Sequence, residues 1–115
     1  MKPILPSLKQ KKRYMVFEII ANRKIRDFAA IADAIYSQSL RNLGEFEVAK
    51  AGIMVLGEKF NYQRQRCVVK VNNRYVDKVK AAMVMLTKIS RQNVIMRCVG
   101  VSGILKKAEQ KYLAM

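Results

Sequence analysis

Apolar and polar residues alternate along four short segments of this chain, and along two longer segments the apolar residues recur every three or four positions. Alternation is typical of strands with one buried face, and the longer spacing is typical of helices. We predict strands over residues 13–21, 48–56, 66–72 and 94–101. We predict helices over residues 28–43 and 74–90, and a final helix that opens at Ser102 and Gly103 and runs through Leu113.

Residue types that cap helices stand at the predicted helix ends. Asp27 can accept hydrogen bonds from the first turn of helix 28–43, and Gly44 can adopt the backbone conformation that closes this helix. Asn73 can cap the start of the next helix. Residues 57–65 are expected to form the loop of a hairpin between the second and third strands.

The predicted order of elements is β-α-β-β-α-β with an additional C-terminal helix. This order predicts an α+β sandwich of the ferredoxin-like type, which RNA-recognition-motif domains share. Right-handed crossovers place the first and third strands at the centre of the sheet and the fourth beside the first. Cys67 and Cys98 then lie two strands and about 10 Å apart, which is too far for a disulfide.

The chain divides into an arm and one domain. Its 115 residues suffice for a single domain. Residues 1–12 contain Pro3, Pro6 and several lysines but no acid, so we expect an extended basic arm before a domain over residues 13–115. No segment approaches the roughly 20 consecutive apolar residues of a membrane span, and the N-terminus lacks the pattern of a secretory signal. We therefore expect a cytoplasmic protein.

Charge narrows the possible functions. The chain has 23 Lys and Arg against eight Asp and Glu, no His and a formal net charge of +15, yet 51% of its residues are hydrophobic. This apolar content excludes a disordered basic tail, and a folded cationic surface attracts polyanions. Without His the chain lacks the usual general base and a common metal ligand. Its acids suggest no close pair, so the sequence predicts no catalytic residues and no metal site.

The end of the arm is the densest run of positive charge and the first candidate RNA contact. Its cations are Lys9, Lys11, Lys12 and Arg13. A basic arm beside a basic domain favours binding to the RNA backbone. The alternative is a solvated tail that only keeps the protein soluble.

The turn before the last helix is the second candidate RNA contact. Ser102 and Gly103 precede Lys106 and Lys107, and Lys111 follows in the same helix. Cations in a first helical turn oppose the helix dipole, and a phosphate bound at that helix end would reverse the effect. The alternative is that the glycines turn the chain and Ser102 caps the helix.

The outer face of the predicted sheet is largely apolar. Its apolar members are Val16, Ile20, Val68, Ile95 and Val99. We expect them to be covered by the last helix, a second copy or a protein partner. RNA-recognition motifs stack bases on aromatic residues of the central strands, and the third strand has none on this face. Phe60 and Tyr62 of the 57–65 loop could stack bases or fold back on their own hairpin.

Three segments together resemble a known family. They read LPSLKQKKRYMVFEII, VDKVKAAMVMLTKI and VIMRCVGVSGILKKAEQKYL. Their content and order are similar to the protein component 2 family of archaeal ribonuclease P, which has a eukaryotic counterpart. The similarity covers nearly the whole chain and is weakest in the 57–65 loop.

The resemblance implies a non-catalytic RNA-binding subunit of ribonuclease P, the endoribonuclease that removes the 5′ leader from precursor tRNA. In this family the RNA subunit carries the chemistry with magnesium, and the protein needs no cofactor of its own. The implied partners are the ribonuclease P RNA, precursor tRNA, a TIM-barrel-like protein subunit and further protein subunits. Two rival hypotheses are a small basic ribosomal or other ribonucleoprotein structural protein, and a standalone nuclease.

Overall fold

A twisted sheet of five antiparallel strands, in the order β2-β3-β1-β5-β4, forms the centre of the computed structural model, which describes residues 11–113. The strands are β1 (Lys12–Ala21), β2 (Met54–Asn61), β3 (Arg66–Asn72), β4 (Lys88–Ile89) and β5 (Gln92–Ser102). The helices are α1 (Phe28–Ala51), α2 (Val76–Val84) and α3 (Leu105–Ala108). A 3₁₀ turn, η2 (Asn73–Tyr75), precedes α2, and a π-helical turn, η3 (Glu109–Leu113), follows α3.

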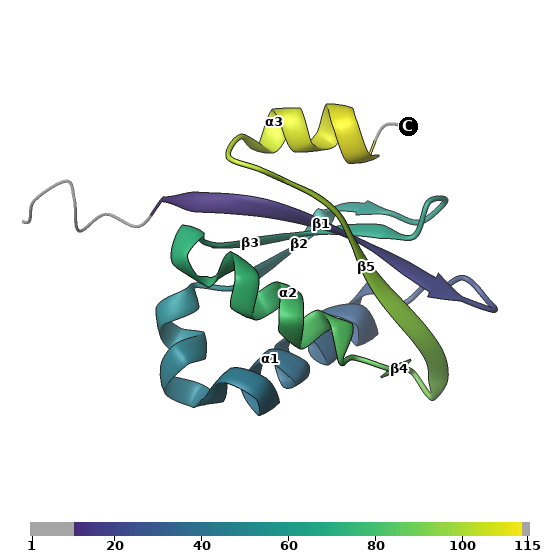
Figure 1. Cartoon of the computed structure of the whole chain (residues 1–115). Coiled ribbons are helices and arrows are strands. Elements are labelled where there is room, and N and C mark those ends of the chain that lie inside the picture. The colour runs from purple at the N-terminus through teal and green to yellow at the C-terminus, as the bar shows by residue number, and fades with distance from the viewer. Residues whose placement is uncertain (1–10, 114–115) are drawn as a thin grey trace, which may run out of the picture.

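The predicted ferredoxin-like fold is confirmed, and two layers of helix enclose its sheet. Helices α1 and α2 cover one face and α3 covers part of the other (Figure 1). The central positions of β1 and β3 and the place of β5 beside β1 follow the prediction. Strand β4 is an addition, paired with the start of β5 at the sheet edge. Of the predicted arm, Lys12 already belongs to β1, and residues 1–10 lie outside the described part.

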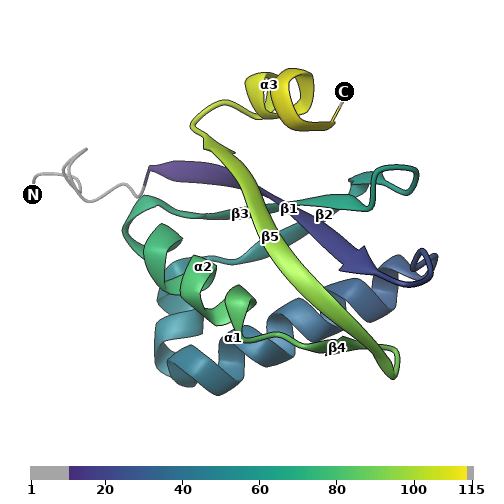
Figure 2. The same ribbon diagram turned by 45° about the vertical axis from the view of Figure 1, so that its right-hand side comes forward.

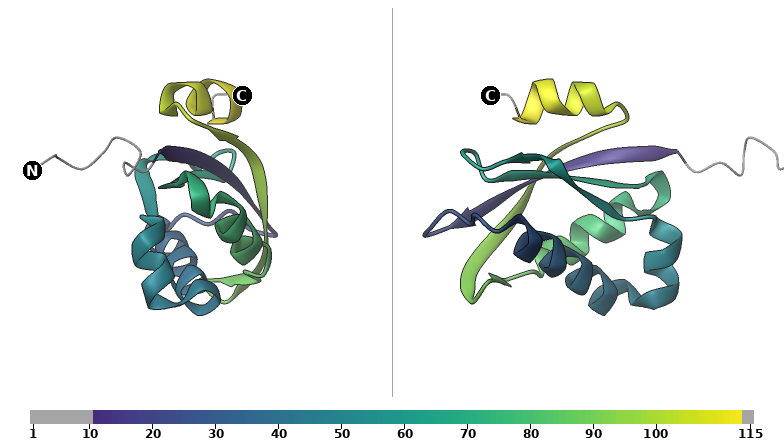
Figure 3. Two further views of the ribbon diagram at one scale, coloured as in Figure 1. Left: turned by 60° about the vertical axis from the view of Figure 1, so that its left-hand side comes forward. Right: turned by 180° about the vertical axis from the view of Figure 1, so that it is seen from behind.

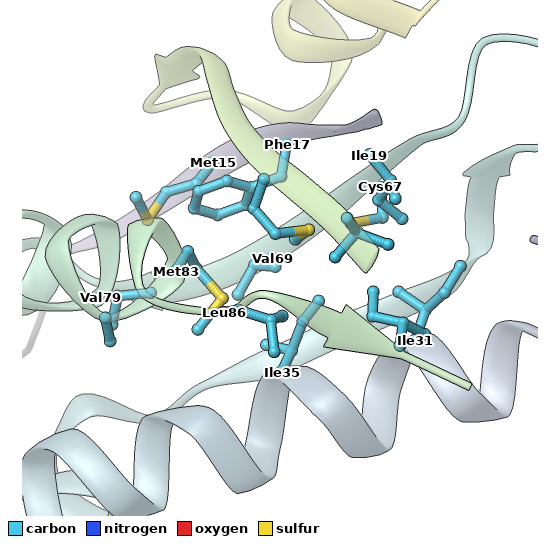
Figure 4. Packing of buried hydrophobic residues seen from close by; sticks show 14 of the residues in the cluster. Met15, Phe17, Ile19, Ile31, Ile35, Cys67, Val69, Val79, Met83 and Leu86 are labelled. Atoms are coloured by element: carbon cyan, nitrogen blue, oxygen red, sulfur yellow. The ribbon is translucent and has the colours of Figure 1, made fainter. Parts of the chain in front are cut away.

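The main core lies between the sheet and the two long helices. The alternation of β1 is confirmed, because Met15, Phe17 and Ile19 are buried against α1 and α2 (Figure 4). Phe17 pairs with Cys67 on one side and with Cys98 on the other, so the cysteines lie two strands apart as predicted. Both cysteines are free.

Helix α1 consists of two helical segments, and the first one starts and ends where the sequence predicts. The Ala29 amide donates to Asp27 Oδ1 at 3.0 Å, which confirms the cap. Gly44, with φ 85° and ψ 162°, ends the first helical segment as predicted, and a second segment continues beyond this kink to Ala51 and closes at Gly52 with φ 61°. The predicted strand over residues 48–56 is therefore wrong in its first half. Strand β2 instead runs through part of the expected loop, up to Asn61.

Helix α2 is shorter than predicted. Asn73 makes no capping bond and instead begins the 3₁₀ turn η2. The helix ends at Val84, after which Leu86 and Ile89 are still buried but lie outside the helix, Leu86 in the closing turn and Ile89 in β4. Ile89 pairs with Gln92 across a two-residue turn, and this pairing with β5 takes the place of a further helical turn. None of the helices within residues 11–113 is long and apolar enough to cross a membrane.

The second layer is formed by α3 and η3, which lie across the outer face of β1, β3 and β5 (Figures 2 and 3). The register of β1 and β5 shifts between Val16 and Phe17. At this bulge two consecutive residues of β5 face the last helix. Val99 packs against the apolar cluster of Val16, Val68, Ala108 and Leu113, and Gly100 lies beneath the Tyr112 ring. Bulges of this kind bend a strand and redirect its side chains.

Candidate nucleic-acid interface

The start of β1 lies beside the turn that leads into α3 (Figure 1). Tyr14 pairs with Ser102 of β5 on one side and with Lys70 of β3 on the other. Neighbouring strands are about 4.8 Å apart, so Lys70 lies roughly 10 Å from Ser102 across the sheet. Because Tyr14 pairs with Ser102, the two basic segments predicted from the sequence, residues 11–13 before Tyr14 and residues 102–107 after the end of β5, meet at one end of the sheet.

We call the cations of these two segments, together with Lys70 of β3, the β1-start cluster. Its described members are Lys11, Lys12, Arg13, Lys70, Lys106 and Lys107. Lys70 is an addition to the candidate RNA contacts that the sequence identified. The only feature of the sequence that could have indicated Lys70 is that its strand, residues 66–72, is predicted to neighbour the first strand, which begins at Arg13. Lys9 lies outside the described residues.

Arg13 connects the two segments of the cluster directly. A Cβ atom added at Gly103 would lie 3.0 Å from Arg13 Nη1, so the guanidinium rests against the turn. The same Nη1 donates to the Lys12 carbonyl at 3.2 Å. An arginine held in this way presents a planar group of donors that suits phosphate oxygens.

Lys12 is held by the neighbouring strand. Its ammonium group donates to the Asn72 side-chain oxygen, and the Asn72 amide group in turn donates to the Lys50 carbonyl at the end of α1. Asn72 is almost fully buried. These bonds fix the first residues of β1 in the sheet, so this part of the cluster is built into the fold.

Ser102 does not cap the last helix. Its Oγ accepts from the Ile104 amide at 3.2 Å and donates to the Ile104 carbonyl at 3.0 Å, while Ile104 itself occupies the N-cap position without a side-chain bond. Helix α3 then has only four residues in α geometry. The π-helical turn η3 continues it to Leu113, and Lys106 and Lys107 stand in the first turn as exposed cations of the β1-start cluster.

The last helix covers much of the apolar outer face. Val16 and Val68 are fully buried there against Ala108 and Leu113, and Val99 is partly buried with them. The remaining two members, Ile20 and Ile95, are 45% and 64% exposed and pair across β1 and β5. The region where an RNA-recognition motif stacks bases is therefore largely occupied by the chain's own helix.

Gly100 permits the close approach of this helix. A Cβ atom at Gly100 would lie 2.1 Å from Tyr112 Cζ. The carbonyl oxygens of Tyr112 and Leu113 also accept bonds from Arg66 at 2.6 Å and from Asn61 at 2.7 Å. The last helical turn, up to Leu113, is thus fixed to the sheet by both packing and polar contacts.

We expect Gly100→Ala to destabilise the protein by roughly 1–3 kcal/mol, the usual range for overpacking. The added methyl group must displace the Tyr112 ring. In a Tyr112→Ala background the same change should have little further effect. Urea unfolding of the wild type, both single variants and the double variant measures this coupling. Additive effects on stability would show that the ring does not depend on Gly100.

The two loop aromatics face the protein. Phe60 packs on Phe28 with 5.6 Å between ring centroids and contacts the main core. Tyr62 has the Lys24 ammonium and the Arg26 guanidinium over its ring, at 5.4 and 5.6 Å from its centroid. The rings therefore do not fold back on their own hairpin, as the sequence alternative had it, but pack on the segment of residues 24–28.

Comparison with known proteins places this geometry in a family. The Rpp14/Pop5 family profile matches residues 13–113. The chain belongs to the Rpp14/Pop5 family. Archaeal relatives include proteins named ribonuclease P protein component 2 from Thermococcus kodakarensis, 35% identical over 95% of this chain and 88% of the relative, and Archaeoglobus fulgidus, 35% identical over 98% of each.

A solved structure shares the fold of this Rpp14/Pop5 protein. A chain in the cryo-EM structure of yeast ribonuclease MRP superposes with a TM-score of 0.62, covering 83% of this chain and 76% of that one. The two sequences are only 10% identical. The likeness therefore concerns the architecture of sheet and helices.

Two acidic side chains of this Rpp14/Pop5 protein are held by contacts with neighbouring side chains. Glu18 pairs with Arg97 at 2.7 Å and with Arg66 at 3.4 Å. Glu47 accepts a bond from the Tyr75 hydroxyl at 2.7 Å, which lowers the pKa of this carboxyl. Within residues 11–113 no three Cys, Asp or Glu side chains come together in a way that could hold a metal ion.

The cysteines of this Rpp14/Pop5 protein are poor nucleophiles. Burial raises the pKa of the Cys67 thiol to about 12. Burial also raises the pKa of Cys98. A thiol must ionise to attack a substrate, so both groups are protonated and unreactive near neutral pH.

Proposed function

We propose that this protein is a non-catalytic RNA-binding subunit of ribonuclease P that supports the catalytic RNA in removing the 5′ leader from precursor tRNA. The observation that carries the proposal is the β1-start cluster, in which cations from the two ends of the described chain meet on an Rpp14/Pop5 fold. The names of the archaeal relatives support the same role.

The proposed role is electrostatic. RNA segments that fold close together repel each other through their phosphates, and Lys and Arg side chains reduce this repulsion when they replace bound counterions. Magnesium would be held by the RNA, because the described residues offer no group of metal ligands. The protein would therefore stabilise the active shape of the RNA without taking part in bond cleavage.

We also propose a surface for a protein partner. Ile20 and Ile95 form an exposed apolar pair on the outer sheet face, bordered by the paired charges of Glu18 and Arg97. Exposed apolar patches with polar rims are typical of protein interfaces. The occupant that the family resemblance suggests is the TIM-barrel-like subunit of the same ribonucleoprotein.

Reconstitution tests the function. The purified protein alone should leave precursor tRNA intact. Added to the cognate ribonuclease P RNA with its partner subunits, it should lower the magnesium concentration needed for half-maximal cleavage. The measurement is the cleavage rate against magnesium with and without the protein. Robust cleavage at the mature 5′ end by the protein alone, or an unchanged magnesium requirement, would contradict the proposal.

A further inference from the structure

A second group of cations lies at the opposite end of β1, away from the β1-start cluster. Residues 22–24, which follow β1, and residues 90–92, which connect β4 to β5, line a surface hollow of about 490 Å³. Its lining residues are Asn22, Arg23, Lys24, Ser90, Arg91 and Gln92. No acidic side chain is among them.

The two segments are joined by a specific bond. The Arg23 amide donates to Gln92 Oε1 at 2.7 Å, and Ala21 pairs with Val94 just before. These contacts fix the backbone on which Arg23 and Arg91 stand. Both side chains are exposed, and neither takes part in any ion pair found within residues 11–113.

The β4–β5 turn has an unfavourable backbone for its residues. Ser90 and Arg91 have φ angles of 52° and 66°. Two-residue hairpin turns with positive φ at both positions favour Asn and Gly, and other side chains there carry a steric cost. An arginine at this position is explained better by what its side chain binds than by the shape of the turn.

We propose that the hollow lined by Arg23, Lys24 and Arg91 is a second RNA-phosphate site, an inference that rests on the proposed RNA-binding function. Strand β1 has ten residues, and at about 3.3 Å per residue it separates this hollow from the β1-start cluster by roughly 30 Å. The two sites would therefore contact phosphates on different segments of the bound RNA.

The test combines Arg23→Ala with Arg91→Gly. Glycine relieves the turn, so the thermal midpoint should hold or rise. Binding to the cognate ribonuclease P RNA should nevertheless weaken, and the slope of log affinity against log salt should fall by roughly 0.7–0.9 for each phosphate that the variant no longer neutralises. The control is Arg41→Ala with Lys80→Ala, which removes two exposed cations of α1 and α2.

The outcomes separate the two proposals. A slope and affinity equal to those of the control, while changes in the β1-start cluster still weaken binding, would overturn the second site alone. Failure of the unchanged protein to bind the RNA would instead overturn the proposed function. A slope that falls additively when both clusters are changed supports two independent sites.

Discussion

Val16→Glu is expected to destabilise the protein by about 3–5 kcal/mol, the range for a buried charge without a partner. Val16 has no exposed surface, because Ala108 and Leu113 close over it from the last helix. The sequence left open whether the last helix, a second copy or a partner covers this residue, and the structure shows that the last helix does. The change is therefore expected to affect folding first. Urea unfolding gives the decrease in stability, and limited proteolysis reports whether the last helix has detached.

Ile95→Glu is the matched change on the same sheet face. Ile95 is 64% exposed, so its replacement should alter the free energy of unfolding by no more than about 0.5 kcal/mol. If the proposed partner surface is correct, this variant should fold normally and bind the TIM-barrel-like subunit poorly. Normal assembly would remove Ile20 and Ile95 from the interface. A Val16→Glu protein as stable as the wild type would contradict the packing of α3.

The second large effect is expected from Lys106→Glu combined with Lys107→Glu. RNA affinity and reconstituted activity should fall sharply, and the log–log salt slope should decrease by roughly 0.7–0.9 for each phosphate left without its cation. Both lysines are exposed, so stability should change by no more than about 0.5 kcal/mol. Filter binding across a salt series and thermal unfolding measure the two quantities.

The control for this reversal is Arg41→Glu combined with Lys80→Glu. It lowers the net charge by the same amount on the exposed sides of α1 and α2. Comparing RNA binding by the two double variants shows whether the position of the changed cations matters, because both variants have the same net charge. Equal RNA binding by both would mean that the turn before α3 has no special part in recognition.

Alternating segments were predictable from the sequence because their period fixes which side chains are buried. The strands around Phe17, Val69 and Met96 all appear within two residues of their expected bounds. Their order in the sheet followed from the handedness of crossovers. These features depend on local pattern and on rules that hold for most folds.

Other features depended on contacts distant in sequence. Gly44 has the local signature of a helix end, but the burial of Ala51 and the bond from Asn72 to the Lys50 carbonyl support another stretch of helix beyond it. The spacing of Val79, Met83 and Leu86 continues a helical pattern, yet pairing of Ile89 with β5 stops the helix.

The sequence identified most of the basic residues of the candidate site but did not show that they lie together. The sequence identified Arg13 and Lys106 as separate basic elements, and only the pairing of Tyr14 with Ser102 brings them together. Lys70 joins them through the pairing of β3 with β1. Cross-strand neighbours of this kind depend on the register, which the alternation of a single strand does not specify.

The contact between Arg13 and Gly103 has a consequence for biosynthesis. Residues 11–13 leave the ribosome early, while the turn and α3 leave it nearly ninety residues later in the chain order. A nascent chain therefore carries an unfinished cationic surface and an uncovered Val16 until translation reaches the last helix. If the β1-start cluster binds RNA as proposed, its full charge becomes available only after the last helix has been made and has folded onto the sheet.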